Sequence, residues 1–240
     1  IEGPDLLRCV DIYTGLVLWE RALPGVGKLY NNTGHHPGAN GTGANYNSVS
    51  DGVYVLYGRK CLRLDLETGK TLIEYVLPKG NGTAPELCYI NAADDVLILG
   101  CDLDTDADSE KRQYEDYISC QRLAVLDRKT GKPLWSIDAE FQFRNNAICV
   151  GGGRLYCVDL LSEFEIRRLE RRGRKTSGSS RLYALDLQTG KPIWKTDDEV
   201  MGTWLSYSDK HDLLFETGRP GRDVLRGEPG GMRALRAADG

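Results

Sequence analysis

The stretch "RLYALDLQTGKPIW", residues 181–194, decides the fold of this chain, because altered copies of it occur at several other places in the sequence. Its apolar residues alternate with polar ones on both sides of a polar turn, which predicts two strands joined as a hairpin. Asp186 opens the turn, Gly190 provides the positive φ that such a short loop needs, and Trp194 ends the second strand. The stretch therefore predicts a β-hairpin that carries a large aromatic ring.

Four copies of this hairpin phrase align on their turn glycines, and the first part of a fifth copy occupies residues 234–240. The copies are "CVDIYTGLVLW" (9–19), "RLDLETGKTLI" (63–73), "VLDRKTGKPLW" (125–135) and "ALDLQTGKPIW" (184–194), and the fifth reads "ALRAADG" (234–240). The glycines lie about 50 to 60 residues apart, so one supersecondary unit recurs with loops of variable length. The residues that we expect to shape and dock these hairpins are Asp11, Gly15, Trp19, Asp65, Gly69, Asp127, Gly131, Trp135, Ala184, Asp186, Gly190 and Trp194.

The repeated unit contains more than the hairpin. One hairpin cannot bury a tryptophan ring, so each ring must pack on a neighbouring unit. Most of the turns follow a further strand, for example "VYVLYG" ahead of "KCLRLD" within residues 53–65. Four short antiparallel strands in each unit predict an all-β chain built of β-propeller blades. About four blades fit between residues 1 and 240, which we expect to be a single propeller region and part of a larger ring.

The phrase A-x-D-x-x-T-G-x-x-x-W resembles the tryptophan-docking motif of the PQQ-like (pyrroloquinoline-quinone) repeat family, and Ala184 to Trp194 match it in full. Elsewhere Cys9, Arg63 and Val125 replace the alanine, Ile73 replaces a tryptophan, and Arg236 replaces an aspartate. The resemblance implies a ring of about seven or eight blades, each locked to the next by its tryptophan. The departures place regular docking of the second blade in question. The family includes quinoprotein alcohol dehydrogenases and BamB-like outer-membrane assembly scaffolds.

Scaffolds and enzymes share this motif, so the motif alone does not decide the function. The resemblance implies that an enzyme of the family uses a calcium ion, a catalytic aspartate and, in many members, two adjacent cysteines over the cofactor. No adjacent cysteines occur in this sequence, and no aspartate matches the catalytic context. We therefore expect a non-catalytic binding or assembly scaffold without PQQ. A PQQ-dependent alcohol dehydrogenase and a carbohydrate- or polymer-binding propeller are the alternatives.

The acidic stretch "DLDTDADSEKRQYED", residues 102–116, is a candidate calcium site. Asp104, Asp106 and Asp108 stand at positions one, three and five of a calcium-loop pattern, and Glu115 stands at position twelve. Hard oxygen ligands at alternate positions can surround a single calcium ion. The pattern lacks the usual glycine at position six, so a solvated acidic loop between two strands is the alternative.

Two other segments are expected to be surface features. Residues 31–45 are rich in glycine and asparagine and contain His35 and His36, but no third metal ligand is evident. Residues 159–180 predict a short helix followed by a basic, flexible loop, inserted between two strands. Its arginines can dock an acidic partner, and a solvated loop is the simpler interpretation.

The bulk composition is that of an ordinary globular chain, with 240 residues, 40% hydrophobic, and a net charge of -4 at pH 7. It indicates neither a nucleic-acid partner nor a membrane span. We expect a protein or polymer partner on the propeller faces and, from the family resemblance, a periplasmic or extracellular location in a bacterium. The seven cysteines are expected to be free and buried, with a disulfide between Cys149 and Cys157 as the alternative in an oxidising compartment.

Overall fold

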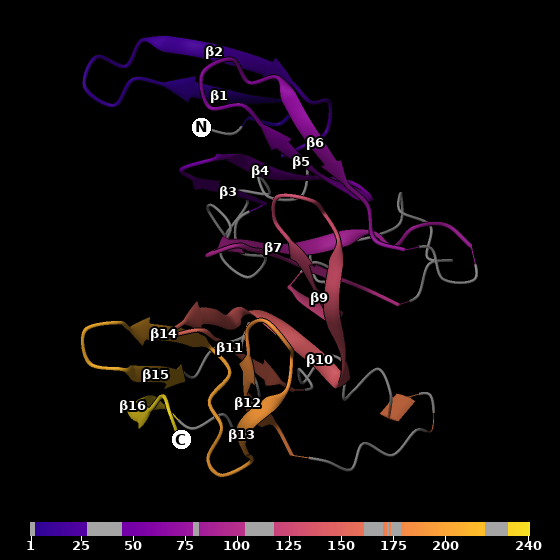
Figure 1. The fold of residues 1–240 in the computed structure, drawn as a ribbon. Coiled ribbons are helices and arrows are strands. Elements are labelled where there is room, and N and C mark those ends of the chain that lie inside the picture. The colour runs from indigo at the N-terminus through magenta and orange to yellow at the C-terminus, as the bar shows by residue number, and fades with distance from the viewer. Residues whose placement is uncertain are drawn as a thin grey trace. The chain divides into compact units, whose positions relative to one another are not determined.

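The structure is a computed structural model that describes residues 3–27, 45–78, 82–103, 118–160, 170–171, 173, 179–218 and 230–240. These residues form strands joined by turns, and only Glu170 and Arg171 among them are helical (Figure 1). Every strand pair with an assigned register is antiparallel. The expectation of an all-β chain is therefore confirmed.

The chain divides into two compact units, one of residues 1–119 and 123–133 and the other of residues 120–122 and 134–240. The first unit contains β1 (Leu6–Val10), β2 (Val17–Ala22), β3 (Tyr46–Val49), β4 (Gly52–Tyr57), β5 (Lys60–Leu64), β6 (Thr71–Tyr75), β7 (Leu87–Ala93), β8 (Val96–Cys101) and most of β9 (Ser119–Asp127). The second contains most of β10 (Pro133–Gly151), β11 (Arg154–Asp159), β12 (Arg181–Asp186), β13 (Pro192–Thr196), β14 (Trp204–Ser208), β15 (Leu213–Gly218) and β16 (Gly231–Arg236).

The sheet β3-β4-β5-β6 of the first unit is a complete blade, with its strands hydrogen-bonded in chain order. Strand β4 is apolar on both faces, and alternate residues enter two different hydrophobic clusters. Val53 and Val55 pack in the cluster that contains Trp19 of β2, whereas Tyr54 and Leu56 pack in the cluster that contains residues of β7 and β8. Successive side chains of a strand point to opposite faces of its sheet, so a blade that lies between two other sheets requires apolar residues on both faces of the strand.

The second unit repeats this arrangement. Strands β11, β12 and β13 pair in chain order with the last residues of β10, whose register with β11 shifts between Phe143 and Ile148. The three-stranded sheet β14-β15-β16 is separate, and one hydrophobic cluster contains residues of this sheet and residues of β10, β11 and β12. Ala184 of β12 and Ala237 after β16 both belong to this cluster and are completely buried.

All seven cysteines are free thiols. Cys149 of β10 lies opposite Tyr156, and Cys157 of β11 lies opposite Ile148, so the two sulfur atoms belong to different cross-strand pairs. The alternative of a disulfide between Cys149 and Cys157 is therefore wrong for this structure. Burial raises the pKa of the Cys149 thiol to about 12, so this cysteine behaves as a small apolar residue.

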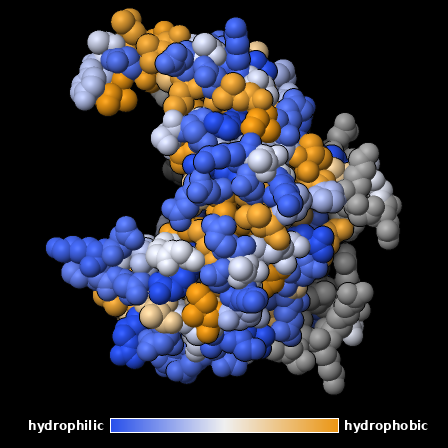
Figure 2. Space-filling model, viewed as in Figure 1, coloured by the Kyte–Doolittle hydropathy of each residue, from blue (hydrophilic) through white to orange (hydrophobic). Residues whose placement is uncertain are grey.

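The surface of the first unit carries apolar side chains at the turn between β1 and β2. Ile12, Tyr13 and Leu16 of this turn are exposed. Figure 2 shows orange, hydrophobic surface over the β1–β2 hairpin at the top of the view, beside blue and white residues. Of the predicted insertion 159–180, only residues 159, 160, 170, 171, 173, 179 and 180 fall within the described residues.

Candidate functional site

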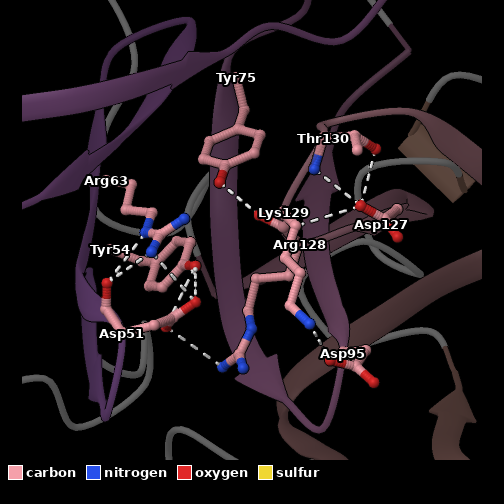
Figure 3. A network of polar contacts seen from close by, with 9 residues as sticks. All are labelled: Asp51, Tyr54, Arg63, Tyr75, Asp95, Asp127, Arg128, Lys129 and Thr130. Carbon is pink, nitrogen blue, oxygen red and sulfur yellow. Dashed lines mark hydrogen bonds and ion pairs between the residues drawn. The ribbon is translucent and has the colours of Figure 1, made fainter.

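The turn of each repeat is closed by its aspartate. In the third repeat, Asp127 Oδ1 accepts hydrogen bonds from the backbone N–H of Lys129 and Thr130 at 3.1 and 2.7 Å and from Thr130 Oγ1 at 2.7 Å (Figure 3). The backbone N–H of Gly131 donates to the Asp127 carbonyl at 2.8 Å. The Thr130 hydroxyl holds the pKa of the Asp127 carboxyl below its usual value, because hydrogen bonds favour the charged form.

The other turns use the same bonds. The hydroxyl of the turn threonine donates to the aspartate at 2.7 Å in the first and second repeats and at 2.6 Å in the fourth, which involve Asp11, Asp65 and Asp186. The fifth turn differs, because Arg236 stands in the aspartate position and Asp239 in the threonine position. There Arg236 Nε donates to Asp239 Oδ1 at 2.8 Å, and Gly240 N still donates to the Arg236 carbonyl. The turn therefore closes with the polarity of its side-chain bond reversed.

Each tryptophan of the motif docks on the turn of the following repeat. The indole N–H of Trp19 donates to the carbonyl of Leu66 at 2.8 Å, that of Trp135 to Leu187 at 3.0 Å, and that of Trp194 to Ala237 at 3.0 Å. The accepting residue directly follows the turn aspartate, or Arg236 in the fifth turn.

The indole ring also covers the turn glycine of the following repeat. An added Cβ would lie 2.6 Å from the Trp19 ring at Gly69 and 2.5 Å from the Trp135 ring at Gly190. The two glycines have φ of +67° and +69°. A glycine is therefore required at each position for two reasons, the positive backbone angle and the absence of space for a Cβ beside the ring.

The second repeat has no tryptophan, and Tyr75 takes its place. Tyr75 Oη donates to the carbonyl of Arg128 at 2.6 Å, and the Tyr75 ring lies 3.1 Å from a Cβ built on Gly131. The tyrosine is 2% exposed. Ile73, at the tryptophan position, is two residues earlier on the same face of β6 and only joins the edge of a hydrophobic cluster. The second repeat therefore docks through a different aromatic residue.

An ionic cluster adds to the contact that Tyr75 makes (Figure 3). Asp51, in the turn before β4, lies 3.4 Å from Arg63 and 3.5 Å from Arg128, and its Oδ2 accepts a hydrogen bond from the Tyr54 hydroxyl at 3.2 Å. Arg63 also donates twice to the Asp51 carbonyl, at 2.8 and 3.0 Å. Two guanidinium groups and one carboxylate therefore connect the turn between β3 and β4, and strand β5, to the turn of the third repeat.

The residue directly across the strand ladder from the tryptophan position is small in two repeats where that position holds a tryptophan and large in the repeat where it holds an isoleucine. Cys9 pairs across the ladder with Trp19, and Ala184 pairs with Trp194, so a small residue lies opposite each of these two indoles. In the second repeat the pair is Arg63 and Ile73, in which the large side chain is on the other strand. The sequence carried a signal for this exchange, because a large residue at 63 accompanies a smaller one at 73.

Asp159 is a buried acid that the sequence did not single out. It is 2% exposed, and its carboxylate accepts hydrogen bonds from the backbone N–H of Glu140 and Phe141 at 2.6 and 3.0 Å. Burial raises the pKa of Asp159, although these bonds oppose the shift. The carboxylate ties the end of β11 to the middle of β10, which is a structural task.

The predicted calcium ligands Asp104, Asp106, Asp108 and Glu115 lie outside the described residues, as do His35 and His36. Within the part of the chain that the structure describes, no group of three or more histidine, cysteine, aspartate or glutamate residues could hold a metal ion. In the same part, no helix is long and apolar enough to cross a membrane.

Known structures place this fold among β-propellers. BamB from Moraxella catarrhalis matches with a TM-score of 0.51 and 16% identity, over 98% of this chain and 56% of that chain. The quinohemoprotein alcohol dehydrogenase ADHIIG from Pseudomonas putida HK5 matches with a TM-score of 0.51 and 14% identity, over 81% and 32%. The computationally designed protein Ika8 matches with a TM-score of 0.53 and 14% identity, over 95% and 51%. This chain therefore spans less than two thirds of each of these proteins.

Because the similar structures include BamB, an alcohol dehydrogenase and a designed protein, the likeness shows the fold alone. No curated protein matches the sequence significantly. The sequence profile of the family described as "Outer membrane protein assembly factor BamB" matches residues 119–240. Since these residues make up just over half of the chain, the chain belongs to this family of PQQ-like β-propellers.

Proposed function

We propose that this chain is part of a non-catalytic scaffold that binds a protein partner through its surface loops. The observation that carries the proposal is the use of the tryptophans. Three of the four in the sequence, Trp19, Trp135 and Trp194, have their N–H groups bonded to a neighbouring repeat and their rings against its turn glycine. A residue occupied on both its polar edge and its face is not available to stack on a planar cofactor.

The family assignment supports the same role, because its description names an outer membrane protein assembly factor. A function in assembly requires exposed binding surface rather than a closed reaction site. On the same basis we propose a periplasmic or extracellular location in a bacterium. A polymer partner would use the same kind of surface.

The competing function is that of a quinoprotein alcohol dehydrogenase, whose fold is similar. When bound, PQQ would carry out the redox step, and the protein would have to supply a base, a metal and a stacking surface. The test is to incubate the purified protein with PQQ and calcium, and then to measure cofactor retention after gel filtration and alcohol-dependent reduction of an acceptor dye. We expect neither retention nor dye reduction. Stoichiometric retention together with turnover would refute the scaffold function.

A further inference from the structure

The turn between β1 and β2 exposes two apolar side chains at positions where the other repeats carry polar ones. Tyr13 is 90% exposed and Leu16 is 66% exposed. Tyr13 is the second residue after the turn aspartate, and Leu16 directly follows the turn glycine. The two residues belong to one closed turn, in which Asp11 N donates to the Leu16 carbonyl at 2.9 Å.

Docking of another repeat on this turn would leave Tyr13 and Leu16 exposed. In the second, third and fourth repeats, an aromatic ring from the preceding repeat already covers the turn glycine. The residues at the positions of Tyr13 and Leu16 there are exposed all the same: Glu67 and Lys70, Lys129 and Lys132, and Gln188 and Lys191. In the third and fourth repeats docking buries a different position, where Arg128 is 9% exposed and Leu187 is 1% exposed, whereas Leu66 at the same position of the second repeat is 38% exposed. The first repeat has Ile12 at this position.

The first turn also differs from the others in charge. Residues 11–20 contain no lysine or arginine, whereas every other complete repeat has a lysine directly after its turn glycine. The charged residues are Asp11 and Glu20, and Glu20 is paired with Arg8 across the ladder at 2.5 Å. Asp11 is ionised at neutral pH, as an aspartate ordinarily is, and the Thr14 hydroxyl lowers the pKa of its carboxyl further. The exposed apolar residues therefore belong to the same turn as one carboxylate.

We propose that the turn of residues 11–18 is a docking surface for a protein partner that presents apolar side chains bordered by lysine or arginine. Exposed apolar residues favour association with another apolar surface, and the Asp11 carboxylate selects a partner of the opposite charge. The same carboxylate opposes binding to an anionic lipid surface, because like charges repel. This inference rests on the proposed scaffold function and gives it a location.

The test uses the full chain and two fluorescent probe peptides, one of alternating leucine and lysine and one of alternating leucine and glutamate. The variant Tyr13→Gln/Leu16→Lys places in the first turn the residues that the fourth repeat carries at the same positions. The matched control is Gln188→Ser/Lys191→Gln, which changes equally exposed positions of the fourth turn. We expect the leucine–lysine peptide to bind about tenfold more tightly than the leucine–glutamate peptide, and the first variant, but not the control, to lose about tenfold in affinity.

Hydrogen exchange should show protection of residues 11–18 by the leucine–lysine peptide. Equal affinity of the first variant and the unmodified protein would overturn the proposal, and so would equal binding of the two peptides. Vesicles of phosphatidylcholine, with and without phosphatidylglycerol, provide the lipid comparison, and binding to them that the first variant abolishes would replace the protein partner with a membrane. Peptide binding elsewhere on the chain would refute this docking surface but not the proposed scaffold function, whereas PQQ-dependent turnover would refute the proposed function itself.

Discussion

Replacing Gly69 with alanine should destabilise the protein more than the same change at Gly15, because an indole ring covers only the first of these glycines. The two residues end equivalent turns of the first unit, with φ of +67° and +71°. A Cβ on Gly69 would lie 2.6 Å from Cε3 and 2.8 Å from Cδ2 of Trp19, and a Cβ on Gly15 would meet nothing within 4 Å. The pair therefore separates the cost of the backbone angle from the cost of the contact.

The magnitudes follow from these two costs. A left-handed backbone angle costs a residue with a Cβ about 1–2 kcal/mol, and both variants lose this amount. Forcing an extra carbon against a packed ring costs about 1–3 kcal/mol more, and only the Gly69 variant loses it. We therefore expect a loss of about 1–2 kcal/mol for Gly15→Ala and about 2–5 kcal/mol for Gly69→Ala. Gly131→Ala should fall between them, since its Cβ would lie 3.1 Å from the Tyr75 ring.

Urea unfolding followed by far-ultraviolet circular dichroism measures these differences, and hydrogen exchange in β5 and β6 assigns them to the first unit. Losses for Gly15→Ala and Gly69→Ala that agree within about 0.5 kcal/mol would refute the docking geometry, because only the contact with Trp19 distinguishes the two sites.

Four more outcomes are expected. Tyr75→Ala should cost about 3–5 kcal/mol and Tyr75→Phe about 1–3 kcal/mol in urea unfolding, whereas Ile73→Ala should cost less than Tyr75→Ala; the reverse order would disprove the substitution of one docking residue for the other. Trp194→Ala should cost about 3–5 kcal/mol, and a loss within about 0.5 kcal/mol of zero would contradict its docking role. The Thr189 hydroxyl lowers the folded-state pKa of Asp186, so the stabilisation of the fold by the ionised carboxylate is present above about pH 4 and is lost as the pH falls through the lowered pKa. Asp186→Asn should reduce this acid dependence of the urea midpoint, and an unchanged dependence would rule out a stabilising role of the carboxylate. If Asp104, Asp106, Asp108 and Glu115 bind calcium, calcium at millimolar concentration should raise the melting temperature, and Asp106→Asn should abolish most of the gain; no thermal shift and no heat of binding in calorimetry would leave the interpretation as a solvated loop.

The repeated hairpins could be predicted because their bonds are local. The turn aspartate, threonine and glycine interact within five consecutive residues, as Asp127 and Gly131 do, so the residue pattern alone specifies the turn. The all-β chain and the PQQ-like propeller fold, which are both confirmed, could be predicted because a hairpin that recurs along the chain leaves few ways to bury its aromatic rings.

The docking contact of the second repeat could not be predicted in the same way. Ile73 in the tryptophan position raised a question that only the packing answers, through the hydrogen bond of Tyr75 with Arg128. A partial signal was present, because Tyr75 is two residues from Ile73 and side chains at that spacing share one face of a strand. The cluster around Asp51 gave no signal at all, since Asp51, Arg63 and Arg128 come from three separate segments.

The sequence by itself determined the hairpin turns, the order of the repeats and the all-β class. The tertiary structure alone decided which side chain docks each repeat and which surface stays exposed. The docking bonds join residues 47, 53, 52 and 43 positions apart, and a pattern read along a chain carries no information about which distant carbonyl will accept a given N–H or O–H group. The exposure of Tyr13 and Leu16 follows from the same cause, because a residue is exposed or buried only in relation to the segments that pack around it.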